Sequence, residues 1–179
     1  MDEYYWKKAY ANTWGISSER ERWLAAYLER ETGRKVFLTG FGAGSTAFIP
    51  GNAEKNGYQK GDADLYVDGT NIYIEVTGPL VKNVKAADPL WFRPDKLKNA
   101  AGNAGHDVFL AHHCMSEDLW RIIHIDNELK ERFAKGQFPV VTPFRQGRRE
   151  RYVEIAVYDK CIKDLSYLVS YIKADSHVL

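Results

Sequence analysis

The segment from Gly61 to Thr77 constrains this chain more than any other, because its side chains alternate twice between apolar and polar types. Leu65 and Val67 alternate with acidic and aromatic residues, and residues 72–77 repeat the pattern after a short loop. Alternation with a period of two is typical of strands that bury one face. The sequence therefore predicts a β-hairpin over this segment.

The hairpin predicts that Asp64 and Glu75 lie on one face of a sheet. Turning the chain at Gly69–Thr70 places Asp64 directly opposite Glu75. Turning it at Asp68–Gly69 places Asp62 opposite Glu75, with Asp64 one diagonal step away. Directly opposed residues share a face, so both registers bring the two carboxylates to the same side.

Two carboxylates held this way repel each other, and a hard divalent cation bound by their oxygens would offset the repulsion. The alternative is a solvated polar face on an edge hairpin. Tyr66 and Tyr73 share the face with the carboxylates, and residues 72–76 are largely apolar, which favours a partly buried site. The pair is therefore the first candidate for chemistry.

The order of predicted elements indicates a mixed α/β core, with an antiparallel hairpin and a later strand that is reached through a helix. A length of 179 residues favours one domain, with a core at about 17–125 and a C-terminal extension at about 126–179. Helices are expected at about 3–11, 17–31, 94–103, 126–135 and 162–173, and strands at 36–39, 106–111, 119–125 and 152–158.

Composition limits the class of protein. The net charge is +1, so any phosphate-binding surface requires local segregation of positive charge. No apolar run approaches the ~20 residues of a membrane span, and the N-terminus is unlike a secretory signal. Cys114 and Cys161 are too far apart for a disulfide framework or a metal knuckle. We expect a cytoplasmic protein with no membrane segment and no organic cofactor.

Glu21 allows two interpretations. Ser18 and Glu21 fit a capping box at the start of a helix, which would explain the acid without a function. Glu21 also lies on the same helical stripe as Leu24 and Leu28, which should face the core. An acid in the first turn can serve both purposes.

His112, His113 and Cys114 would be candidates for a metal site or for an unrelated hydrolase. Neighbouring residues on a strand point to opposite faces, so the two histidines cannot bind one ion without a break in the strand. His112 and Cys114 are too few for a closed zinc site. A strand end with hydrogen-bonded imidazoles is the favoured interpretation.

Several segments could contact phosphate. The glycine-rich stretch from Gly40 to Ser45 fails the dinucleotide spacing, but it is typical of a loop near a substrate backbone, with Ser45 as a phosphate contact. Positive charge is concentrated in two groups, for which solvated surface is the usual interpretation. The groups are Lys82, Lys85, Arg93, Lys96 and Lys98, and Arg145, Arg148, Arg149 and Arg151.

Short motifs in this order resemble the PD-(D/E)XK nuclease superfamily, and within it archaeal Holliday-junction resolvases. The resemblance covers about residues 18–113. It rests on the helix residues 21–28, on Thr32-Gly33-Arg34-Lys35-Val36, on Gly44-Ser45, on Ala63-Asp64 and on Ile74-Glu75-Val76-Thr77. Ala63 stands where the motif has proline.

The resemblance implies a restriction-endonuclease-like mixed sheet flanked by helices, in a single nuclease-like domain. It implies Mg²⁺, with Mn²⁺ as a substitute, held by Asp64, Glu75, the Val76 carbonyl and Glu21. Ser45 would lie near the scissile phosphate. DNA is the implied substrate, with a possible preference for branched structures, and a homodimer is the implied assembly. Phosphate contacts are expected from Lys82, Lys85, Arg93, Arg148 and Arg149.

Thr77 is the main departure, because it stands where the motif has a catalytic lysine. That lysine orients the attacking water and stabilises charge on phosphorus. We expect Lys96 to replace it from the helix after Pro94, with Lys82 and Lys98 as rivals. The alternative is a nuclease-fold module that has lost catalysis and binds DNA or protein.

Overall fold

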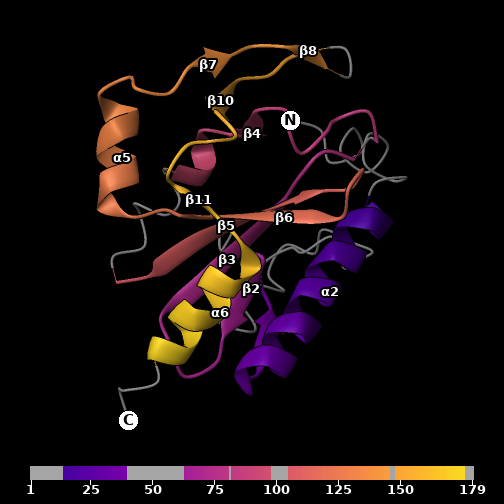
Figure 1. Ribbon diagram of the computed structural model, residues 1–179, viewed down its shortest axis with the longest axis vertical. Helices are drawn as coiled ribbons and strands as arrows, with labels where there is room; N and C mark the ends of the chain where they lie inside the picture. The colour runs from indigo at the N-terminus through magenta and orange to yellow at the C-terminus, as the bar shows by residue number, and fades with distance from the viewer. Residues whose placement is uncertain (1–13, 40–62, 81, 98–104, 146–147, 176–179) are drawn as a thin grey trace, which may run out of the picture.

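The computed structural model describes residues 14–39, 63–80, 82–97, 105–145 and 148–175 (Figure 1). The expected helix at 3–11, Ser45 and Lys98 lie outside these ranges. The described helices are α2 (Trp14–Thr32), α5 (Asn127–Ala134) and α6 (Leu165–Ala174). The described strands are β1 (Val36–Leu38), β2 (Leu65–Val67), β3 (Ile72–Thr77), β4 (Leu90–Phe92), β5 (Asp107–Cys114), β6 (Leu119–His124), β7 (Val140–Val141), β8 (Phe144–Arg145), β9 (Arg148–Arg149), β10 (Tyr152–Ile155) and β11 (Ile162–Lys163).

The main sheet has six strands in the order β1-β2-β3-β5-β6-β11. Strands β2 and β3 form the predicted hairpin, with Leu65 paired to Ile74 and Tyr66 to Tyr73. This is the register in which Asp64 faces Glu75. Strand β3 pairs in parallel with β5, and β5 pairs antiparallel with β6. The prediction of a mixed α/β fold, with a mixed sheet flanked by helices, is confirmed.

One face of the main sheet is covered by α2 and α6 (Figure 1). The alternation of β3 sends Ile72 and Ile74 into this core, where they meet Leu24 and Leu28 of α2. All four side chains are fully buried, which removes their apolar area from water and stabilises the packing. The hydrophobic stripe predicted for α2 is therefore its core face.

Helix α2 begins earlier than the sequence predicted. It starts at Trp14, so Ser18 and Glu21 lie inside the helix and not at its cap. Both are buried. The capping-box interpretation is therefore wrong, because the backbone N–H groups of that turn are already within the helix. The helix ends before Gly33, whose positive φ of 73° and bond to Glu29 close it as expected.

The other face of the main sheet carries a second core beneath a small sheet in the order β4-β10-β7 (Figure 1). Val108 and Leu110 of β5 pack there with Phe92 of β4 and Val153 of β10. The sequence did not predict β4, β7, β8 or β9. Each has only two or three residues, too few to establish an alternation.

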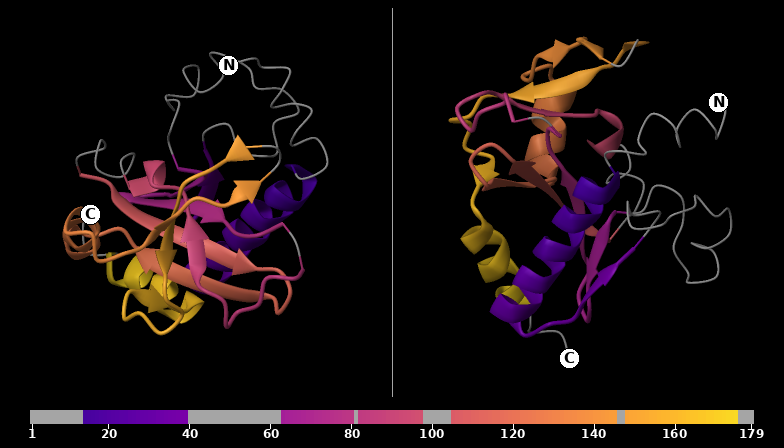
Figure 2. Two further views of the ribbon diagram at one scale, coloured as in Figure 1. Left: turned by 90° about the horizontal axis from the view of Figure 1, so that it is seen from above. Right: turned by 90° about the vertical axis from the view of Figure 1, so that its right-hand side faces the viewer.

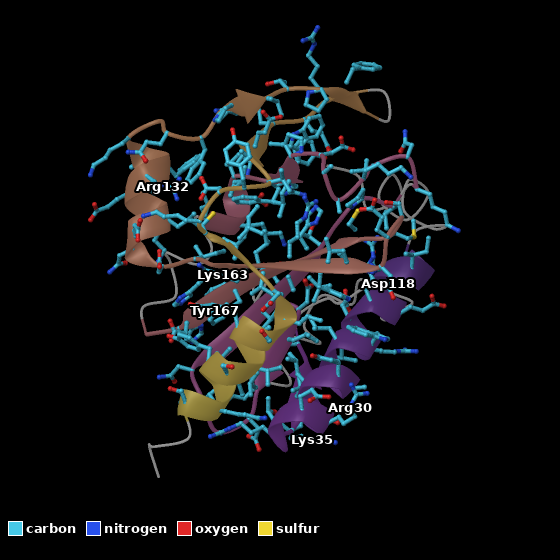
Figure 3. The ribbon with its side chains drawn as sticks, viewed as in Figure 1. Arg30, Lys35, Asp118, Arg132, Lys163 and Tyr167 are labelled. Carbon is cyan, nitrogen blue, oxygen red and sulfur yellow. The ribbon has the colours of Figure 1, made fainter. Side chains whose placement is uncertain are left out.

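The end of the chain also differs from the expectation of one helix at 162–173. Ile162 and Lys163 form β11, which extends the main sheet beside β6. Asp164 then caps α6 by accepting a bond from the Tyr167 N–H, so the helix begins at Leu165. Figure 3 labels Lys163 and Tyr167, where the ammonium lies 6.0 Å from the ring centre. The C-terminal segment, which was expected to be an extension beyond the core, thus adds a strand to the main sheet and a helix to its core.

No helix within the described ranges combines the length and the apolar character needed to span a membrane.

Candidate active site

Asp64 sits immediately before β2, where the hairpin enters the main sheet. Its backbone carbonyl accepts a bond of 2.7 Å from the Thr39 N–H, and the Thr39 hydroxyl donates to the Ala63 carbonyl. Its side chain accepts a bond of 2.8 Å from the Val76 N–H. The Asp64 carboxylate is therefore held against the backbone of β3.

Glu75 lies on β3, buried on the face that carries the second core. Its Oε2 atom is 2.5 Å from the Nζ atom of Lys96. Lys96 belongs to a helical turn at residues 95–97, which follows Pro94 and β4. The structure therefore brings the lysine expected from this helix to the carboxylate of the hairpin.

The two carboxyl groups interact directly and share a hydrogen bond. Burial raises the pKa of both Asp64 and Glu75 above the ordinary range, and the charge of Asp64 raises the pKa of Glu75 further. The pair therefore holds a proton more tightly than isolated carboxyls do. Negative charge is in excess at this position.

Lys96 opposes this repulsion only in part. Burial alone would lower its pKa, but the charges of Glu75 and Asp64 outweigh burial and hold the pKa of Lys96 above its usual value. The ammonium is therefore charged at neutral pH. Its charge lowers the pKa of Asp64, which nevertheless stays raised.

Glu21 reaches the same group from α2. It is 5% exposed, and its charge raises the pKa of Asp64. The helix therefore presents this acid to the hairpin carboxylates, as the Leu24 and Leu28 stripe indicated. Lys96 acts on Asp64 and Glu75, and Glu21 adds a third acid on the side of Asp64.

Thr77 lies beyond Glu75 on β3 and next to a buried row of side chains. Across the sheet Thr77 is level with His112 of β5, and His112 is level with Arg121 of β6. Burial and the Arg121 charge lower the pKa of His112 to about 3, so this imidazole stays neutral. His112 therefore does not supply the positive charge that a lysine at position 77 would provide.

The three residues of the possible metal cluster point to different surroundings. His113 contacts Arg20 and Asp118, and its ring stacks on Trp120. His112 faces Arg121, while Cys114 contacts the Val84 carbonyl. The favoured interpretation, imidazoles with hydrogen-bond partners on a strand, agrees with these contacts.

Arg20 is a residue that the sequence reasoning missed. It is 6% exposed and precedes Glu21 on α2. Its guanidinium donates to the carbonyls of Gly78 and Pro79, which directly follow β3, and to His113. Arg20 lies one helical turn before Leu24, so its place on the core stripe was the available signal.

The remaining predicted contacts do not gather at the carboxylates. Lys82 and Lys85 are exposed on the segment after β3. Arg93 is exposed and forms two bonds with Asp95, of 3.1 Å and 2.6 Å. Arg148 contributes its backbone to β9, and Arg149 of the same strand is exposed. Val76 offers its N–H to Asp64.

Among the described residues, no set of three or more His, Cys, Asp and Glu side chains is arranged to hold a metal ion. Lys96 instead contacts Glu75, whose carboxyl group also interacts with that of Asp64. The excess of acidic groups is the feature that a cation would complement.

Comparison with known proteins gives similarity to solved structures only. No family model matches the chain, and no curated protein matches it. Among solved structures, the chain is similar to a nuclease from a fusselovirus, with 16% identity and a TM-score of 0.49. The similarity covers 90% of this chain and 94% of that one.

Proposed function

We propose that this chain is a metal-dependent endonuclease that hydrolyses DNA phosphodiester bonds, with a restriction-endonuclease-like core. The observation that carries the proposal is the contact of 2.5 Å between Lys96 and Glu75, beside an Asp64 carboxyl that is fixed by the Val76 N–H. Two carboxylates that can hold a metal ion, and an ammonium beside them, can supply the electrostatic stabilisation and the activation of water that phosphodiester hydrolysis uses.

Mg²⁺, or Mn²⁺ in its place, would be held by Asp64, Glu75, the Val76 carbonyl and Glu21. These oxygen donors suit a hard cation, and their raised carboxyl pKa values reflect an excess of negative charge. When bound, the ion polarises the phosphodiester and favours ionisation of water. Because carboxyl groups must be ionised to bind a metal ion, metal binding would lower the pKa values of Asp64 and Glu75.

Lys96 would do what the motif lysine does from the strand. Its ammonium would orient the attacking water and stabilise the charge that develops on the phosphate oxygens. Glu75 positions this ammonium through the direct contact. A charged residue at position 77 is then not needed, because the Lys96 ammonium comes from the helical turn after β4.

DNA would be bound through phosphate contacts from Ser45, Lys82, Lys85, Arg93, Arg148 and Arg149. A homodimer would allow two sites to cut two strands, and branched DNA would be a substrate for such an assembly. We propose a cytoplasmic location for this activity.

A cleavage assay tests the proposal. Linear duplex, single-stranded and four-way-junction DNA are incubated with the protein and Mg²⁺ or Mn²⁺. We expect cleavage by the parent chain and its loss in Asp64→Asn, because the variant removes a metal-binding charge. Asp68→Asn is the matched control, since Asp68 is exposed at the turn of the same hairpin.

The same assay distinguishes the nuclease from the alternative, a binding module without catalysis. A parent chain that binds DNA but cuts none of the three substrates with either ion would contradict the nuclease proposal. It would support a nuclease-fold binding module, which Thr77 favours. Cleavage by Asp64→Asn at the parent rate would place the active site elsewhere.

A further inference from the structure

The β8–β9 hairpin is a separate two-stranded ribbon at the end of the small sheet. Phe144 pairs with Arg149 and Arg145 with Arg148, and these strands form a sheet of their own. At the base of the ribbon, the Glu150 N–H donates to the Pro143 carbonyl. Figure 2 shows the ribbon extending away from the main sheet at the edge of the molecule.

Positive charge is concentrated on this ribbon. Residues 144–151 contain four arginines and one glutamate, while the whole chain has a net charge of +1. Arg149 and Arg151 are exposed, and no ion pair joins them to an acidic side chain in the described ranges. Glu150 accepts a bond of 2.6 Å from the Tyr152 hydroxyl. Arg149 and Arg151 are therefore available to an anionic partner.

Phe144 adds an apolar group to the same ribbon. Its side chain is 71% exposed, and it lies directly across from Arg149. A phenylalanine so exposed gains by burial in an apolar environment. A base step that opens in the minor groove offers such an environment, with phosphates on both sides for arginines.

We propose that the β8–β9 ribbon binds the minor groove of duplex DNA, with Phe144 as a wedge between base pairs and Arg149 and Arg151 on the flanking phosphates. The inference rests on DNA as the substrate of the proposed function, and it does not depend on hydrolysis.

The fold links the ribbon to the active site. Strand β10 follows the ribbon directly, and its Val153 pairs with Phe92 of β4. Lys96 lies in the helical turn just after β4. A duplex bound to the ribbon is thus attached to the small sheet. The edge strand of that sheet, β4, leads into the turn from which Lys96 contacts Glu75.

The charge component is tested by binding without cleavage. Anisotropy of a labelled 30-base-pair duplex is measured in EDTA over a range of salt concentrations. Arg149→Glu/Arg151→Glu should reduce the slope of log affinity against log salt by about two, because each lost phosphate contact removes roughly one unit. Lys135→Glu/Lys160→Glu makes the same charge change on exposed residues elsewhere and should leave the slope close to the parent value.

The wedge is tested with duplexes that carry 2-aminopurine, whose emission rises when a base unstacks. The parent chain should raise the emission on binding. Phe144→Ala should abolish the rise while keeping the salt slope, because the arginines remain. Tyr158→Ala is the control, since that aromatic side chain is 89% exposed outside the ribbon, and it should behave as the parent does.

Each contrary result is distinct. Equal salt slopes for the two double variants, with both folded by thermal melting, would overturn the ribbon as a binding surface. If Arg149→Glu/Arg151→Glu lost as much affinity for single-stranded DNA as for the duplex, the duplex groove would not be the target of the ribbon. No emission change with the parent chain would overturn the wedge. A parent that binds in this way but never cuts would overturn the nuclease proposal and leave the ribbon in place.

Discussion

The contact between Lys96 and Glu75 supports the role proposed for Lys96 in place of a lysine at position 77. In the strand pattern, a lysine at position 77 would share the face of Glu75. In this chain the ammonium comes from a helical turn after β4 and reaches the same carboxylate at 2.5 Å. An ammonium therefore lies beside Glu75 even though position 77 is threonine, and it comes from a different element of the fold.

Lys96→Ala should lower the single-turnover cleavage rate by about 10²–10⁴-fold, the range for loss of a group that aids proton transfer. DNA affinity should be almost unchanged, because the other phosphate contacts remain. Lys160→Ala, at an exposed lysine beside Glu128, is the control. The measurement is cleavage of labelled DNA with enzyme in excess.

A second variant distinguishes position from charge. Thr77→Lys in the Lys96→Ala chain places an ammonium on the strand, two residues from Glu75, and should recover part of the lost rate. Full activity in Lys96→Ala alone would refute the assignment of Lys96 and leave the carboxylate pair as the site.

At the scale of the elements, β3 is joined to α2 just beyond its end. Arg20 of α2 donates to the carbonyls of Gly78 and Pro79, and Gly78 packs on the backbone of β5. The helix that carries Glu21 is thereby joined to the strand that carries Glu75. This contact fixes the relative position of two proposed metal ligands.

Gly78→Ala should destabilise the protein by about 3 kcal/mol, from backbone strain and a steric clash together. Gly78 has a φ of 143°, and an added Cβ would lie 2.2 Å from the His113 carbonyl oxygen. Gly136→Ala is the control, because Gly136 has a φ of 69° with no heavy atom within 4 Å of its added Cβ. Urea unfolding of the two variants measures the difference, and equal losses would mean that the close approach is unimportant.

The elements also show what the sequence can and cannot predict. The hairpin was predictable because two strands of alternating residues meet at a short turn, which fixes the register and places Asp64 opposite Glu75. Strand β4 was not, because its partner β10 is about sixty residues away and neither the spacing nor the three residues of β4 give a pattern. The start of α6 was misplaced because Ile162 of β11 lies three residues before Leu165 and so extends the apolar stripe of the helix.

The same limits apply to the proposed site. Glu21 followed from the helical stripe, and Lys96 from the expectation that its helix packs beside the hairpin. Arg20 required knowledge that β3 ends at carbonyls facing α2, which depends on tertiary packing. Metal binding and the DNA contacts of Lys82, Lys85 and Arg148 stay predictions.

At the scale of the whole molecule, the buried acids should make stability depend on pH. The pKa values of Asp64 and Glu75 are raised in the folded chain, so the folded state binds more protons than the unfolded state between the ordinary and raised values. The free energy of unfolding should therefore fall as pH rises through this window.

Asp64→Asn should consequently be more stable than the parent at about pH 8, and the advantage should shrink at about pH 5, where the parent pair is protonated. Urea unfolding at both pH values, without divalent ions, measures it. Asp68→Asn is the control at an exposed site. Added Mg²⁺ should stabilise the parent more than Asp64→Asn, since a ligand of the folded state shifts the equilibrium towards it. A less stable Asp64→Asn at pH 8 would contradict the proposed repulsion.

The pairing of β4 with β10 has a consequence for a chain that is still being synthesised. Domains generally fold from the N-terminus as the ribosome extends them. The hairpin acids and Lys96 emerge early, but β4 pairs within its sheet only with β10, at residues 152–155. A nascent chain that ends before β10 therefore lacks the strand that fixes the turn carrying Lys96. Under the proposed function, the protein would gain the ability to cut DNA only after β10 has been synthesised.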